Sequence, residues 1–135
     1  MGFDVFAAGR HVQVSKVDGP GPLFDVLALP AAYGLHCPQL NKLHERFYDT
    51  TLIAAGSGEL RALHDELILL RDAYRKRREP ELVRDRGVRS QDANVRRPIL
   101  DRLLKDDPTY RAIDSFTTLC VDALASGADL RCEGD

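Results

Sequence analysis

The chain has 135 residues, of which 44% are hydrophobic and 30% are charged, and its formal net charge is −2. These values are typical of one globular domain, and a chain of this length can bury a core of its own. The sequence has no apolar run long enough for a membrane span and no basic, apolar leader, so we expect a cytoplasmic protein without a membrane partner.

The first predicted element is a β-hairpin. Two segments of alternating polarity, FDVFAA and HVQVSKV, flank Gly9-Arg10, and a Gly-X pair suits a two-residue type II′ turn. If Ala8 faces His11, the apolar side chains of both strands share one face, namely Phe3, Val5, Ala7, Val12 and Val14. One face would then cover a core, and the other would lie mostly in water.

Shorter segments follow the hairpin. Residues 23–29 are apolar and fit either a strand or a helix, and residues 30–34 predict a break. Pro38 is suited to the first turn of a short helix, because its missing N–H is not needed there. The β-branched residues 50–54 predict a further strand.

The clearest predicted element is a helix over residues 58–78, with Ser57 as its cap. One apolar face repeats with spacings of three and four residues, through Leu60, Leu63, Leu67, Leu70 and Tyr74. Glu79-Pro80 is predicted to end this helix, since a residue before proline avoids the helical region. Residues 80–96 contain few apolar side chains and predict a long mobile loop.

Two helices and a strand are predicted after this loop. The first helix starts near Pro98, and the second is capped by Asp107-Pro108 and ends at Gly127 in a left-handed conformation. Residues 128–132 predict a final strand. The mixture of elements favours one α+β domain over residues 1–135, with the hairpin and a small antiparallel sheet packed against three to four helices. Its core is predicted to contain Leu63, Leu67, Leu70, Phe116 and Cys120.

The most unusual segment is Arg71–Arg97, which has ten basic and five acidic residues, whereas the rest of the chain has nine basic and sixteen acidic residues. Such asymmetry can steer a charged partner. The favoured interpretation of the segment is nevertheless a solvated helix end followed by a loop, because cations favour helix C-termini, and an acidic protein partner is the better functional alternative. Nucleic acid is disfavoured, since acidic residues interrupt the run and aromatic residues are scarce. The predicted partner-binding residues are Arg75, Arg78, Arg84, Arg86 and Arg89.

Histidine and cysteine spacing predicts neither a metal site nor a cofactor. His36, Cys37 and His44 lack the closely paired ligands typical of zinc sites. An odd set of three distant cysteines does not suggest a disulfide framework. Cys37 precedes a helix start and is the best candidate for a reactive thiol, although a buried structural thiol is the favoured interpretation, and Cys120 is predicted to be buried.

The opening MGFDV strand, the leucine-rich helix and the closing segment CVDALASGADLRCEGD together resemble the form of small bacterial proteins, including immunity proteins that neutralise a partner toxin. The excess of arginine over lysine is also typical of a GC-rich bacterial genome. The resemblance implies a protein partner and assigns no residue a role.

We therefore expect a non-catalytic protein–protein interaction protein, of an immunity or antitoxin-like kind, whose partner is acidic. Two alternatives stay open. One is a small-molecule-binding protein or small enzyme with a pocket between the hairpin and the long helix, which buried polar residues converging on a cleft would favour. The other is nucleic-acid binding through the segment 71–97, which needs one continuous positive surface.

Overall fold

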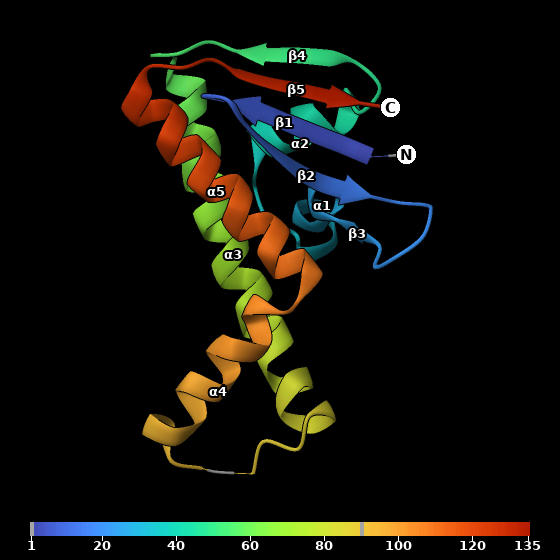
Figure 1. Cartoon of the computed structure of the whole chain (residues 1–135), viewed down its shortest axis with the longest axis vertical. Coiled ribbons are helices and arrows are strands. Elements are labelled where there is room, and N and C mark those ends of the chain that lie inside the picture. Colours follow the sequence, from blue (N-terminus) through green and yellow to red (C-terminus); the bar gives the residue numbers. More distant parts are fainter. Residues whose placement is uncertain (1, 90) are drawn as a thin grey trace.

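Five strands form one antiparallel sheet in the computed structural model, which describes residues 2–89 and 91–135 (Figure 1). The strand order is β3-β2-β1-β5-β4. The strands are β1 (Gly2–Ala7), β2 (Arg10–Lys16), β3 (Phe24–Asp25), β4 (Thr50–Ile53) and β5 (Leu130–Gly134). The helices are the 3-10 turn η1 (Val26–Ala28), α1 (Leu29–Tyr33), α2 (Pro38–Glu45), α3 (Gly58–Asp85), α4 (Ala93–Lys105) and α5 (Pro108–Ser126). The predicted α+β class is confirmed.

The N-terminal hairpin is present, but its turn differs from the prediction. Ala7 pairs with Arg10, so the two turn residues are Ala8 and Gly9, with φ of 49° and 72°. Two consecutive positive φ values are typical of a type I′ turn, whose twist matches that of the flanking strands. The pairing differs from the predicted one by two residues. The predicted apolar face is therefore kept, because side chains alternate with a period of two.

The region after the hairpin also contains more helix than predicted. Residues 23–29 divide between β3, η1 and the start of α1, so both alternatives apply to part of the segment. The predicted break at 30–34 is instead α1, with Pro30 in its first turn and Gly34 in the left-handed conformation at its end. A proline in the first turn and a glycine after the last one are compatible with a short helix.

α2 begins at Pro38, as predicted, and a buried carboxylate satisfies its first turn. The side chain of Glu66, in the middle of α3, accepts hydrogen bonds from the backbone N–H groups of Gln39 and Leu40 at 3.0–3.1 Å. These N–H groups have no partner inside their own helix, and they carry partial positive charge. Glu66 thereby joins α2 to α3 at a position that sequence periodicity did not single out.

The core lies between one face of the sheet and the helices α3, α5 and α2, and α3 and α5 run side by side (Figure 1). All five predicted core residues, Leu63, Leu67, Leu70, Phe116 and Cys120, are fully buried. Asp107 caps α5 by accepting from the N–H of Tyr110, and Gly127 ends that helix with φ of 67°, both as predicted. In the described part of the chain, none of the helices combines the length and the apolar character that a bilayer crossing requires.

The predicted loop at 80–96 is the main error of the sequence analysis. α3 continues through Pro80 to Asp85, and α4 begins at Ala93 and contains Pro98. A proline inside a helix costs about 3 kcal/mol, because it removes a hydrogen bond and its ring clashes with the preceding turn. Contacts between α3 and α4 offset this cost, since Leu82 is buried there. The connection between the two helices is therefore residues 86–92, of which Ser90 lies outside the described residues.

Candidate functional site

The end of α3 and the whole of α4 extend away from the sheet (Figure 1). We call residues 76–106 the helical arm. The two helices share a small apolar cluster separate from the main core, formed by Leu82, Leu100 and Leu104 with Val83, Val88, Leu103 and Tyr110 packed against it. Isolated helices of this length are marginal in water. The cluster therefore explains how the arm keeps its helices beyond the main core.

Ion pairs across the two helices reinforce the arm. Arg75 Nε donates to Glu79 Oε1 at 2.9 Å, and its guanidinium also bonds Asp101 of α4. Arg97 of α4 bonds the same two carboxylates, with its Nε 3.2 Å from Asp101 Oδ1. The neighbouring Glu79 carboxylate raises the pKa of Arg97 further. This network holds α4 against the part of α3 that precedes Pro80.

The buried carboxylate of Asp107 joins the arm to the body. It accepts from Tyr74 Oη at 2.8 Å, from Arg78 Nε at 2.8 Å and from the Tyr110 N–H at 3.0 Å. Arg78 also donates to Glu81 at 2.8 Å. Burial, together with the bond to Asp107, raises the pKa of Tyr74, so this phenol stays protonated as a donor. Asp107 lies in the connection between α4 and α5, and its carboxylate binds side chains of α3 and the first turn of α5. Three parts of the chain therefore meet at this one carboxylate.

A second contact fixes the base of the arm. The guanidinium of Arg77 lies 4.1 Å from the ring centroid of Tyr33 in α1, a cation–π geometry. Burial raises the pKa of Tyr33, although the nearby Arg77 acts in the opposite direction.

The structure divides the five predicted partner-binding arginines into two groups. Arg75 and Arg78 are half-buried and already bound to carboxylates of the fold. Arg84 is exposed, and among the described residues its one ion pair is with its neighbour Asp85, at 3.1 Å. Arg86 and Arg89 are exposed, and neither forms an ion pair within the described residues. Only the members nearest the tip of the arm are therefore available to a partner.

The arm as a whole is basic. It has ten basic and six acidic residues, a net charge of +4, whereas the rest of the chain has nine basic and fifteen acidic residues, a net charge of −6. The sequence analysis did not name Arg96, Arg102 and Lys105 as partner-binding residues, because it assigned residues 80–96 to a loop and Arg102 and Lys105 to a separate helix. A hollow of about 370 Å³ lies between the two helices, lined by Lys76, Glu79, Pro80, Ala93, Arg96, Arg97 and Leu100. Its cations outnumber its single carboxylate.

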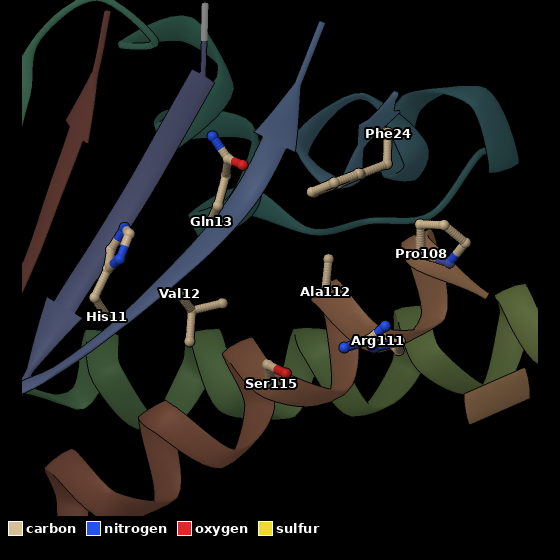
Figure 2. A pocket seen from close by; sticks show the side chains of 8 residues that line it. All are labelled: His11, Val12, Gln13, Phe24, Pro108, Arg111, Ala112 and Ser115. Atoms are coloured by element: carbon tan, nitrogen blue, oxygen red, sulfur yellow. The ribbon is translucent and has the colours of Figure 1, made fainter. Parts of the chain in front are cut away.

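A second hollow, of about 310 Å³, lies between β2 and α5 (Figure 2). It lies beside the hairpin, where a pocket against the long helix was predicted, but the helix that lines it is α5 and not α3. Ala112 projects from α5 toward the sheet, whereas Gln13 points from β2 away from α5 (Figure 2). The polar residues of the lining, His11, Gln13, Arg111 and Ser115, are exposed. The hollow therefore lacks converging buried polar groups.

The histidines and cysteines do not converge. His36 and His44 are exposed, Cys37 is buried, and within residues 2–89 and 91–135 no three His, Cys, Asp or Glu side chains gather as a metal-binding group. Burial and the nearby Glu66 carboxylate raise the pKa of Cys37. The helix start therefore does not make this thiol reactive.

We expect all three thiols to resist alkylation in the native protein. Cys37, Cys120 and Cys132 are buried, and burial raises the pKa of Cys120 and of Cys132 to about 12. The thiolate is the reactive form. Iodoacetamide at pH 8, followed by intact-mass measurement, should add no group to the native chain and three groups in denaturant. Rapid single modification of the native chain at Cys37 would contradict this account.

Comparisons with known proteins give no guide to function: no family model matches the chain, and no curated protein or solved structure is significantly similar to it.

Proposed function

We propose that this chain is a non-catalytic protein–protein interaction protein that binds an acidic protein partner through the helical arm. An inhibitor of the immunity or antitoxin kind is the functional class that this form resembles. The proposal rests on one observation: the arm extends from an acidic body, carries a net charge of +4, and has exposed basic side chains that the fold does not use.

The arm has the further features of a binding surface. Val95 and Ile99 of α4 are exposed beside these cations. Apolar side chains next to unpaired arginines give a partner both area to bury and carboxylate-binding groups. The hollow between the helices places Lys76 and Arg96 together, and neither forms an ion pair in the described part of the chain. A partner aspartate or glutamate fits this hollow.

Nucleic acid fits the arm less well. Four carboxylates, Glu79, Glu81, Asp85 and Asp101, lie among its cations and already neutralise several of them. Phosphate binding needs concentrated positive charge, and single strands also need exposed aromatic rings. Tyr110, the aromatic residue of the arm's apolar cluster, is half-buried there. A small-molecule function is less favoured, because the hollow between β2 and α5 lacks converging buried polar groups.

Charge reversal at the tip tests the proposal. The variant Arg86→Glu, Arg89→Glu, Arg96→Glu changes side chains without internal ion pairs, so its free energy of unfolding should change by less than about 0.5 kcal/mol. Its association rate with the partner, captured on immobilised protein and measured by surface plasmon resonance, should fall at least about tenfold at low salt. Dissociation should change less, because peripheral charges act mainly on encounter.

The matched control is Arg46→Glu, Arg61→Glu, Arg111→Glu, which makes the same change of net charge on exposed arginines of the body. It should leave association near the wild-type rate. Equal loss in both variants would mean that only total charge matters, which would contradict a binding role for the arm. Fluorescence anisotropy with labelled duplex and single-stranded DNA addresses the alternative, and sub-micromolar binding at physiological salt would overturn the preference for a protein partner.

A further inference from the structure

The face of the sheet opposite the core carries two ordered rows of side chains. Pairing of the strands places Phe6 beside both His11 and Arg131, and Arg131 beside Leu52. Residues paired across strands project to the same face. His11, Phe6, Arg131 and Leu52 therefore form one row across β2, β1, β5 and β4. We call it the cationic row.

The next row on this face of the sheet is acidic. Asp4 pairs with Gln13 and with Glu133, and Glu133 pairs with Thr50. Gln13, Asp4, Glu133 and Thr50 therefore form a parallel row on the same face, which we call the acidic row. All eight side chains of the two rows are exposed or half-buried. Their inward-facing neighbours on β1 and β5, such as Val5 and Cys132, are buried in the core.

The two rows are linked by a hydrogen bond and an ion pair. His11 Nε2 lies 2.6 Å from Asp4 Oδ1, and Arg131 Nε lies 3.0 Å from Glu133 Oε1. The second contact is an ion pair, and Arg131 has five N–H donors in all. Within the described residues, no hydrogen bond occupies these donors. Leu52, at the end of the cationic row, exposes 62% of its surface.

The aromatic ring of Phe6 on this face is already stacked against its neighbours in the cationic row. The rings of Phe6 and His11 are stacked at 4.7 Å with an interplanar angle of 18°, and the guanidinium of Arg131 lies 4.6 Å from the Phe6 centroid. His11 and Arg131 flank Phe6 in the row, so both faces of the ring are covered. A base-stacking platform needs an open aromatic face. The groups on these rows that a partner can contact are therefore the charged side chains of Arg131 and Glu133 and the exposed Leu52.

We propose that this face binds the same face of a second copy of the chain. A two-fold axis between the faces and parallel to the rows places the cationic row of each copy opposite the acidic row of the other. Arg131 then meets Glu133 of the second copy, and the reverse contact follows by symmetry, as isologous dimers require. The free N–H groups of Arg131 extend the internal pair into a four-membered charge network. Leu52 of each copy packs against Thr50 of the other, which removes its apolar surface from water.

Sedimentation equilibrium of the full chain, from low micromolar to several hundred micromolar, tests this proposal. The wild-type chain should reach twice its monomer mass, and salt should weaken the dimer. Arg131→Glu alone and Glu133→Arg alone should each raise the dissociation constant at least about tenfold, because like charges then face one another. The double variant Arg131→Glu, Glu133→Arg restores opposite charges and should recover the dimer.

Two controls make the outcome decisive. Leu52→Asp should also weaken the dimer, whereas Leu69→Asp, an exposed leucine on α3 away from this face, should not. A chain that stays monomeric at the highest concentration would overturn the proposal. So would a dimer that survives both single reversals, or one that is abolished only by the arm variant Arg86→Glu, Arg89→Glu, Arg96→Glu. The arm's partner binding is measured separately, so failure here leaves the proposed function standing.

Discussion

Replacing Leu67 by alanine is expected to lower the free energy of unfolding by about 2–5 kcal/mol. Leu67 is fully buried in the core between α3, α5 and the sheet. The loss combines the transfer of removed apolar atoms with the cavity that they leave, and a rigid sheet on one side limits collapse of that cavity. Urea denaturation of both proteins, monitored by circular dichroism, measures the difference.

Leu69→Ala is the matched control, because Leu69 lies on the same helix and exposes 47% of its surface. It should change the free energy of unfolding by less than about 0.5 kcal/mol, since little apolar area leaves water at this position on folding. Equal losses at the two positions, or an unchanged midpoint for Leu67→Ala, would mean that the buried face of α3 is assigned incorrectly.

Replacing Asp107 by alanine should cost about 2–4 kcal/mol of stability. The substitution removes the acceptor of Tyr74 and Arg78 and the cap of α5 together. Removing one partner leaves the other buried group unsatisfied, and that penalty exceeds the worth of the bond itself. The cost stays below that of a fully buried pair, because Arg78 keeps 30% of its side-chain surface in water. Urea denaturation monitored by circular dichroism measures the loss.

Asp107→Asn separates the two roles of this residue. An amide oxygen can still cap α5, so the smaller loss of this variant reports the missing charge opposite Arg78. Asp106→Ala controls for removing a carboxylate at the same corner, because the Asp106 side chain is exposed and has no hydrogen bond or ion pair in the described part of the chain. A loss for Asp106→Ala as large as that for Asp107→Ala would show that the contacts of Asp107 do not matter.

The fold was predictable where short-range patterns decide it. The spacing of Leu60, Leu63, Leu67 and Leu70 predicted the buried face of α3, because a helix aligns residues three and four apart. Asp107-Pro108 and Gly127 predicted the ends of α5 by their backbone chemistry. The hairpin face was also predicted despite the wrong turn residues, since a two-residue change of pairing keeps each side chain on its face.

The helical arm was not predictable in the same way. The preference of proline for helix ends reflects only its local free-energy cost inside a helix. It predicted a helix end at Pro80, where α3 in fact continues. The contacts that offset this cost come from α4, with Leu82 packed against Leu100 and Leu104. The charged segment was recognised, but the roles of its arginines were not. Arg75 bonds a carboxylate 26 residues away and Arg78 one 29 residues away, and sequence spacing does not reveal such pairs.

Photocrosslinking in the source cell tests the central claim, binding of an acidic protein by the arm, most directly. A benzophenone amino acid replaces either Val95 on the arm or Val121 on α5. These positions form a matched pair, because both are helical valines and they expose 50% and 47% of their surface.

The account predicts one discrete protein adduct from position 95, with a partner of acidic composition, which disappears when Arg86 and Arg89 are also changed to glutamate. Position 121 should yield no such adduct. Three results would contradict the account. The first is an adduct to nucleic acid at position 95, and the second is equal adducts at both positions. The third is a protein adduct at position 121 with none at position 95.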